Sequence, residues 1–331
     1  MPRMLILRSA GIGDVAMLVH AVRMLRATYP DLSILIATKK RMPAFFYGIP
    51  DLDFIPVDSV GQIVRDASQR GVDLVADMRN EVRGKAVRFL LGIRGVRTAS
   101  YRQDKCGRRP LLRRKNKRVR VLRNNVLRFC DVFARLGYPI APPPVPGRAE
   151  LPLPAVFGER TPGLWVGFAP FSLSPLKTYP EDLRDRLVAA LCARYDRVFL
   201  FSGPGEECSY ADRMAAAFPN LTPVFGKTDL AGEVALMAHL DAVITMDSSA
   251  MHMASLAGAP LVAVWGATHP SVGYSAWGAV PERNYVQLGL SCRPCSVYGE
   301  GRCHRGDLAC LREISPEQIV ERVDVLLSAQ K

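Results

Sequence analysis

The chain has 331 residues, of which 49% are hydrophobic, and a formal net charge of +13. This length suits two domains, and the composition is that of an ordinary soluble protein. Charged residues and prolines break every apolar run before the roughly 18 residues of a membrane span, and the short apolar run at 1–8 is typical of a strand rather than a secretory signal. The composition therefore excludes a membrane-spanning protein, and we expect a cytoplasmic one.

Strands and helices alternate along the first half of the chain. Apolar runs predict strands at 4–7, 33–37, 53–57 and 73–77. Helices are predicted between them over about 14–29 and 59–70, and a later one over about 119–136. Such alternation is typical of a parallel sheet with helices on both faces.

A proline-rich stretch at 138–163 separates the halves and predicts an extended connector. The alternation then restarts, with strands at 164–169, 197–203, 241–245 and 260–265 and with helices beginning near residues 181, 206, 230, 248 and 315. We therefore expect an α/β fold of two doubly wound, Rossmann-like domains, residues 1–150 and 151–331, facing a central cleft. The final helix either stays on the second domain or packs back on the first.

The positive charge is concentrated in the first half. Residues 1–150 hold 29 Lys and Arg against 12 Asp and Glu, whereas residues 151–331 hold 15 against 19. Within the first half, 102–128 carries twelve basic residues and a single acid, Asp104. A field of this size attracts a polyanion, namely nucleic acid, an anionic membrane face or a phosphorylated glycolipid, although a solvated loop without a partner is the alternative.

The segment 246–270 carries the clearest sign of a ligand site. Asp247 and a turn of small residues open a helix directly after one strand, and a second strand follows and ends in Gly-Ala-Thr-His. The carboxyl ends of parallel strands and a helix N-terminus bind anions in such sheets. The N–H groups of 248–250 would face a diphosphate, with His252 one turn later on the same side. The alternative is an ordinary turn with a capping Asp247.

Two other loops are predicted to reach sheet edges. Gly11 and Gly13 join the first strand to its helix, but the third glycine and the acid of a dinucleotide fingerprint are absent, so a nicotinamide or flavin enzyme is not expected. Asp14 at this strand end is either a helix cap or a base for a substrate hydroxyl.

In the second half, Lys177 follows a strand, and its charge is suited to binding a phosphate. In the turn at 202–207, Gly203 allows a ligand to approach the backbone closely, and Glu206 could bind the hydroxyl groups of a ribose.

Together these motifs resemble glycosyltransferase family nine, the ADP-heptose:lipopolysaccharide heptosyltransferases. The resemblance runs from Gly-x-Gly-Asp at 11–14 through LKTYP at 176–180 and FSGPGEE at 201–207 to DSSAMH at 247–252 and VWGATHP at 264–270. It implies a GT-B fold and an inverting transfer of heptose from ADP-heptose to the lipid A inner core at the cytoplasmic membrane face. We expect this transfer to be independent of a metal ion, because a helix N-terminus and Lys177 can stabilise the leaving diphosphate and the motifs lack the paired acids that usually bind Mg²⁺.

The resemblance also implies roles for individual residues. Asp14 would be the catalytic base, and Lys177 and the backbone of Ser248 and Ser249 would hold the diphosphate. Glu206 would bind the ribose, Asp247 and His252 would orient the donor, and 266–269 would lie beside the adenosine. The complete predicted donor set is Gly13, Thr178, Gly203, Glu206, Asp247, Ser248, Ser249, His252, Gly266 and Thr268. The predicted acceptor set is Arg79, Arg83, Arg113, Arg114 and Lys115.

Four cysteines lie close together near the C-terminus: Cys292, Cys295, Cys303 and Cys310. A C-x2-C pair commonly begins a structural zinc site, but the second half of the spacing is irregular. Reduced packing thiols and a structural zinc both remain open, and disulfides are disfavoured in a reducing compartment. No cofactor is expected to be required for catalysis.

We therefore expect a glycosyltransferase whose partners are a nucleotide-sugar donor, an anionic glycolipid acceptor and the cytoplasmic face of the inner membrane. One alternative keeps the fold and changes the sugar or the acceptor. Another is a basic nucleic-acid-binding protein on a Rossmann-like scaffold. Nucleic acid is not expected, because the basic segment has aromatic residues only at its margins, Tyr101 and Phe129.

Overall fold

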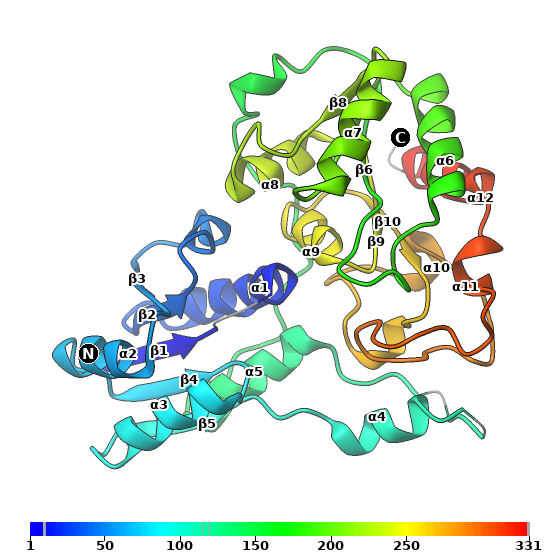
Figure 1. The fold of residues 1–331 in the computed structure, drawn as a ribbon. Helices are drawn as coiled ribbons and strands as arrows, with labels where there is room; N and C mark the ends of the chain where they lie inside the picture. The colour runs from blue at the N-terminus through cyan, green and yellow to red at the C-terminus, as the bar shows by residue number, and fades with distance from the viewer. Residues whose placement is uncertain (9–10, 115, 119, 330–331) are drawn as a thin grey trace. The chain divides into compact units, whose positions relative to one another are not determined.

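The structure, a computed structural model, describes residues 1–8, 11–114, 116–118 and 120–329 (Figure 1). The chain divides into two compact units. Unit 1 comprises Met1–Asp104 and Arg123–Pro144, and unit 2 comprises Lys105–Leu122 and Val145–Lys331. The basic segment at 105–122 therefore groups with the second half of the chain, whereas a boundary after residue 150 had placed it with the first. The reason is hydrophobic packing within unit 2, where Leu111 and Leu122 are buried against Val272.

Unit 1 is built on a five-stranded sheet in the order β3-β2-β1-β4-β5. The strands are β1 (Arg3–Leu7), β2 (Ser33–Thr38), β3 (Leu52–Pro56), β4 (Leu74–Asp77) and β5 (Arg97–Ser100). Every described pairing is parallel, and Leu7 is in register with both Ala37 and Asp77. Because a parallel sheet is covered on both faces, its central strands are continuous apolar runs rather than alternating ones.

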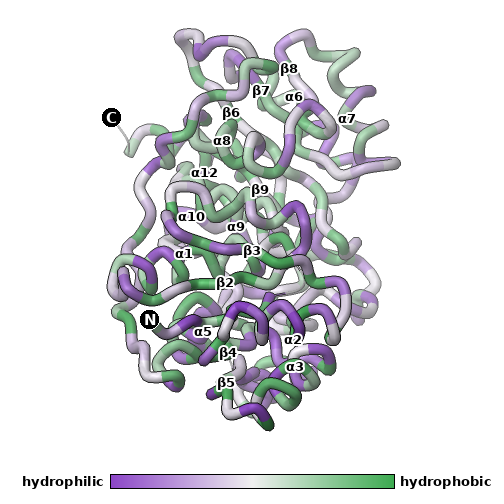
Figure 2. The backbone as a smooth tube through the Cα atoms, turned by 90° about the vertical axis from the view of Figure 1, so that its left-hand side faces the viewer, coloured by the Kyte–Doolittle hydropathy of each residue, from purple (hydrophilic) through white to green (hydrophobic). Residues whose placement is uncertain are grey.

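Two pairs of helices cover this sheet. The helices α1 (Ile12–Thr28) and α5 (Asn125–Arg135) contact each other, and so do α2 (Val60–Gln69) and α3 (Val82–Gly92) on the opposite side (Figure 2). Apolar residues of α2 and α3 join those of β1 and β2 in one core. The helix α5 begins later than the expected residue 119 because the side chain of Asn124 caps it, accepting a hydrogen bond from Val126 N. A short 3-10 turn (Pro43–Phe46) completes the unit.

Unit 2 is built on a six-stranded sheet in the order β11-β10-β9-β6-β7-β8, again with every described pairing parallel. The strands are β6 (Trp165–Ala169), β7 (Arg197–Leu200), β8 (Leu221–Pro223), β9 (Ala242–Met246), β10 (Leu261–Trp265) and β11 (Tyr285–Gln287). The α/β class and the two doubly wound sheets are thus confirmed.

Helices pack on both faces of this second sheet. On one face, α6 (Glu181–Arg194), α7 (Glu206–Ala217) and α12 (Pro316–Ser328) share a core with β6 and β9. The helices α8 (Leu230–His239) and α9 (Ser249–Leu256) contact each other and lie on the opposite face of the sheet from α6 and α12 (Figure 1). The shorter helices are α4 (Lys105–Leu111), α10 (Pro281–Asn284) and α11 (Ala309–Arg312), with 3-10 turns at Ala155–Phe157 and Pro270–Val272.

The final helix packs within its own unit. Ser315 and Gln318 form a capping box at its start, and its buried residues Ile319 and Val323 join the unit 2 core beside α6. The apolar face of α12 is therefore buried within unit 2. Within the described ranges, none of the helices combines the length and the apolar character that crossing a bilayer requires.

Candidate functional site

The loops that follow β6, β7, β9 and β10 carry most of the predicted donor residues. Because these strands are parallel, their carboxyl ends lie at one edge of the unit 2 sheet. The expected convergence of distant loops is confirmed for two of them, since Lys177 after β6 and Asp247 after β9 are in direct contact. This edge of unit 2 is the candidate donor site.

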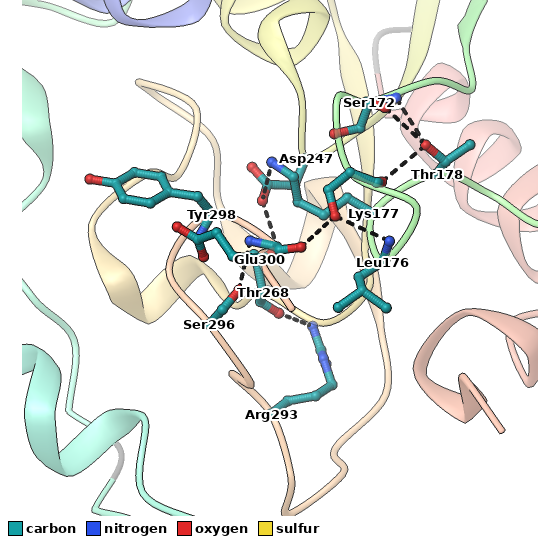
Figure 3. Close-up of polar contacts among 12 residues, drawn as sticks. Ser172, Leu176, Lys177, Thr178, Asp247, Thr268, Arg293, Ser296, Tyr298 and Glu300 are labelled. Carbon is teal, nitrogen blue, oxygen red and sulfur yellow. Dashed lines mark hydrogen bonds and ion pairs between the residues drawn. The ribbon is translucent and has the colours of Figure 1, made fainter. Parts of the chain in front are cut away.

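A cluster of three side chains, the buried Asp247 and Thr268 and the half-buried Lys177, forms the centre of this edge (Figure 3). The Nζ atom of Lys177 lies 3.5 Å from Oδ2 of Asp247. The hydroxyl of Thr268, which follows β10, donates a hydrogen bond of 2.6 Å to the same carboxylate oxygen. Asp247 is therefore paired with a cation and a donor at once, which holds its carboxylate and the Lys177 ammonium group in fixed positions.

The backbone around Lys177 is fixed by hydrogen bonds of its own loop (Figure 3). The N–H groups of Lys177 and Thr178 donate to the carbonyl of Ser174, at 2.9 and 3.1 Å. The hydroxyl of Thr178 donates to Ser172 O and accepts from Ser172 N, each at 3.1 Å. Thr178, predicted to contact the donor, thus stabilises the loop 172–178, which carries Lys177 and is called the lysine loop below.

The N-terminus of α9 is open to an anion. Ser248 is its N-cap, yet within the described residues no side chain caps the first turn. The Oγ of Ser248 and the Nδ1 of His252 are buried without a hydrogen-bond partner in this part of the structure. Unpaired N–H groups and the positive end of the helix dipole favour a negative group here, and a bound ligand would also satisfy these two buried polar atoms.

His252 is neutral in the folded protein. Burial and, as the smaller cause, the positive charge of Lys177 together lower its pKa from 6.5 to about 3. A neutral imidazole offers one donor and one acceptor, so His252 is suited to hydrogen bonding with a sugar or phosphate rather than to ion pairing.

The turn after β7 differs in one respect from the prediction. Gly203 N donates a hydrogen bond of 2.6 Å to the side chain of Glu207, so this N–H is already used. Glu206 lies beside it in the first turn of α7 with its side chain exposed. Glu207, which the sequence analysis did not select, closes the turn, and Glu206 is left available for a ligand.

Gly266 allows two loops to approach each other. A Cβ atom at this position would lie 2.7 Å from the carbonyl of Leu176, so any side chain would displace the lysine loop. The carbonyl of Gly266 accepts a hydrogen bond of 2.5 Å from Arg293, and the same guanidinium donates to Thr268 O at 2.9 Å. Arg293 is 3% exposed and was not predicted, because its partners are backbone carbonyls that no sequence motif marks.

Asp14 and Gly13 lie in unit 1, in the first turn of α1. Asp14 is not the helix cap, since Gly11 occupies that position with a φ of 82°. The carboxylate of Asp14 forms an ion pair with Arg8, which also donates a hydrogen bond of 2.5 Å to Met78 O. Arg8 is buried and fixes the orientation of the proposed base. Sequence reasoning did not identify Arg8, although it directly follows the first strand.

Unit 1 has a small pocket at the carboxyl ends of its strands, with a cavity volume of about 20 Å³. Arg8, Arg79 and Arg83 line it together with the fully buried Asp77. Asp77 accepts hydrogen bonds from Asn80 N at 2.8 Å and from the guanidinium of Arg88 at 3.0 Å, which shapes the loop before α3. Two of the predicted acceptor residues thus line a pocket beside the partner of Asp14.

The basic segment docks on unit 2 and forms a second pocket there. Lys117 donates hydrogen bonds of 2.7 Å to Cys292 O and Pro294 O. The pocket has a cavity volume of about 410 Å³ and is lined by Arg114, Asn116, Lys117, His269, Leu288, Gly289, Leu290, Ser291 and Arg293. Arg113 is exposed next to it, and the predicted residue Lys115 lies outside the described residues. The basic segment therefore creates a cationic pocket on unit 2 rather than an arm of the first domain.

The four C-terminal cysteines form no disulfide with one another or with any other described residue. Burial raises the pKa of Cys310 to about 11 and raises that of Cys295 as well, and Cys295 Sγ donates to Cys292 O at 3.3 Å. Within the described ranges, no three His, Cys, Asp or Glu side chains are arranged as a metal ion requires. The zinc prediction therefore stays without a test.

Comparison with known proteins identifies one family. Residues 60–300 match the family model described as glycosyltransferase family 9 (heptosyltransferase). The chain is 33% identical over 122 residues to lipooligosaccharide heptosyltransferase 2 of Haemophilus influenzae, a match that covers 35% of this chain and 34% of the relative. It is 27% identical over 166 residues to lipopolysaccharide heptosyltransferase 1 of Pseudomonas aeruginosa, covering 46% and 45%. The chain thus matches less than half the length of either curated relative.

A solved structure resembles the fold along the whole chain. The Escherichia coli ADP-heptose lipopolysaccharide heptosyltransferase II has a TM-score of 0.73 and 18% sequence identity, covering 100% of this chain and 99% of that one. At this identity the likeness shows the fold alone. The two parallel sheets are accordingly those of the GT-B heptosyltransferase structures.

Proposed function

The chain belongs to glycosyltransferase family 9, the heptosyltransferase family, and we propose that it transfers heptose from ADP-heptose to the inner core of lipopolysaccharide. The observation that carries this proposal is the contact of Lys177 with Asp247 beside the uncapped N-terminus of α9. This arrangement is suited to a diphosphate, and the named relatives act on ADP-heptose or on lipopolysaccharide.

Transfer of the sugar leaves negative charge on the departing diphosphate. Lys177 and the N–H groups at the start of α9 are fixed before the donor binds, so they stabilise this charge without reorganising. Neutral His252 and the exposed Glu206 would then contact the sugar and the ribose. Because these groups already supply positive potential, the proposed reaction needs no catalytic metal ion.

Asp14 is the proposed base for the acceptor hydroxyl. Arg8 holds its carboxylate in one orientation, as general base catalysis requires. Arg79 and Arg83 line the neighbouring pocket, and Arg113 and Arg114 lie on the basic segment. These cations would bind the phosphates and sugar carboxylates of the inner core.

A thermal-shift measurement tests the donor class directly. ADP and ADP-heptose should raise the melting temperature in proportion to their occupancy, whereas UDP-sugars should not. Stabilisation by UDP-sugars alone would favour another donor on the same fold. Tight, salt-sensitive binding of oligonucleotides with no effect of ADP-heptose would instead favour a nucleic-acid-binding protein.

A further inference from the structure

The helix α3 exposes an apolar stripe on unit 1. Val82 is 83% exposed, and Phe89 and Ile93 are each 68% exposed. Spacings of seven and four residues place these three side chains on one face of a helix. The opposite face is used for folding, since Val87 and Leu91 are buried in the unit 1 core. Figure 2 shows hydrophobic and hydrophilic residues together on this helix.

Cations flank the stripe on both sides. Residues 79–97 contain six Arg or Lys and one acid, Glu81, which forms an ion pair with Arg79. At about 100° per residue, Lys85 lies on one side of the stripe and Arg83 and Arg94 lie on the other. All three are exposed. Arg88 does not add an unpaired positive charge to this surface, because its guanidinium is paired with the buried Asp77.

We propose that α3 docks unit 1 on an anionic bilayer, with Val82, Phe89 and Ile93 inserted between the headgroups. An apolar stripe bordered by cations is the pattern of a helix that lies in the plane of a membrane interface. The charge pattern favours anionic lipid over a protein partner, since Arg83, Lys85 and Arg94 border the stripe and Glu81, the one acid of 79–97, is already paired with Arg79.

Docking through α3 would also position the unit 1 pocket. Glu81, Arg83, Gly84 and Val87, from the first turns of this helix and the residue before it, line that pocket. A helix lying on the lipid surface would therefore hold the pocket at the level of a lipid-linked sugar. This consequence rests on the proposed lipopolysaccharide acceptor, whereas binding to lipid itself does not.

Vesicle flotation tests the proposal with the full chain. Vesicles of equal parts phosphatidylglycerol and phosphatidylcholine should bind the protein, and phosphatidylcholine vesicles should bind it far less. The triple variant Val82→Gln, Phe89→Gln, Ile93→Gln should lower the partition coefficient by about tenfold or more, because three apolar side chains no longer insert. The pair Lys85→Gln and Arg94→Gln should weaken binding mainly to the anionic vesicles.

The matched control is Val325→Gln, which changes an exposed valine on α12 beside the acids Glu321 and Asp324. It should leave vesicle binding unchanged. If the triple variant has the melting temperature of the wild type and the same rate of transfer to a deacylated, soluble acceptor, it is folded. Flotation measures lipid binding and not transfer. A protein without the proposed transferase activity could therefore still bind vesicles, and the two results are distinguishable. Unchanged binding by the triple variant, or an oligomer that this variant converts to a monomer without any lipid binding, would overturn the proposal.

Discussion

Lys177 and Asp247 form an ion pair that is almost enclosed by unit 2. The two charged groups are 3.5 Å apart, and their side chains are 14% and 8% exposed. Solvent therefore screens this pair much less than a surface pair, and removal of one partner leaves the other charge buried. The pair fixes the Lys177 side chain before a ligand binds. Replacing either residue leaves the charge of the other without its partner.

Replacing Lys177 should abolish most of the activity. We expect Lys177→Ala to lower kcat/KM by about a hundredfold or more, because a fixed positive charge next to the leaving diphosphate is lost. Stabilisation by ADP in a thermal-shift measurement should fall as well. The control Lys227→Ala removes an exposed lysine of the same unit and should keep both properties. Near-normal turnover of Lys177→Ala would remove this residue from the proposed site.

Asp14 should affect the chemical step rather than donor binding. Asp14→Asn keeps the shape of the side chain and removes the base, so kcat should fall by about a hundredfold to ten-thousandfold. The ADP-induced rise in melting temperature should be retained, since the donor groups lie in unit 2. Asp31→Asn, an exposed acid of unit 1, is the matched control. If Asp14→Asn turns over at the wild-type rate, another group must accept the proton.

Thr268 should stabilise the fold through Asp247. Thr268→Val preserves the shape but removes the 2.6 Å hydrogen bond to a buried carboxylate. The free energy of unfolding should fall by about 1 to 3 kcal/mol. Denaturant unfolding measures this, and Thr161→Val at an exposed position should change it by less than about 0.5 kcal/mol. An unchanged unfolding free energy in Thr268→Val would show that the hydrogen bond is not formed.

Acid should destabilise the protein through His252, which is buried, and His269, which is half-buried. Burial lowers the pKa of His252 to about 3 and that of His269 to about 4, against 6.5 in an unfolded chain. Between these values the unfolded chain binds protons that the folded chain does not, so the unfolding free energy falls as the pH drops below about 6.5. For His252 the loss is at most about 1.4 kcal/mol per pH unit.

Denaturant unfolding at about pH 7 and about pH 5 measures this dependence. His252→Asn should lose less stability between the two pH values than the wild type. His304→Asn, which replaces an exposed histidine, should behave as the wild type does. An equal pH dependence in wild type and His252→Asn would contradict the buried, neutral state of His252.

Chelators should not inhibit the transfer reaction. Lys177 and the N-terminus of α9 supply the positive potential that a metal ion would otherwise provide at the diphosphate. The rate with excess EDTA should therefore equal the rate without it. Loss of activity in EDTA that Mg²⁺ restores would show that these protein groups are not sufficient.

The sequence predicted the elements with strong local signals. The helix at 206–217 was predicted with the bounds that the structure shows, because acids at its first turn and apolar positions at helical spacing agree. The short strand β8 (Leu221–Pro223) and the pair α3 and β5 were missed. Three residues give too little periodicity for a strand, and the many cations at 79–97 obscure the buried positions Val87 and Leu91.

The candidate site was predictable only in part. The contact of Lys177 with Asp247 followed from parallel strands whose ends share an edge. The partners Arg8 and Arg293 could not be found in this way, because each binds groups that are distant in sequence or belong to the backbone. The association of 105–122 with unit 2 was also hidden, since it depends on Leu111 and Leu122 within a segment dominated by charge.

Product mass tests the central claim most directly. The purified chain is incubated with ADP-heptose and lipopolysaccharide cores truncated at successive sugars, and each product is measured by mass spectrometry. We expect one core to gain the mass of a single heptosyl residue, with ADP released in equal amount, and Lys177→Ala to give far less of this product in the same time. Wild-type protein that binds ADP-heptose yet adds no heptosyl group to any of these cores would contradict the proposed function.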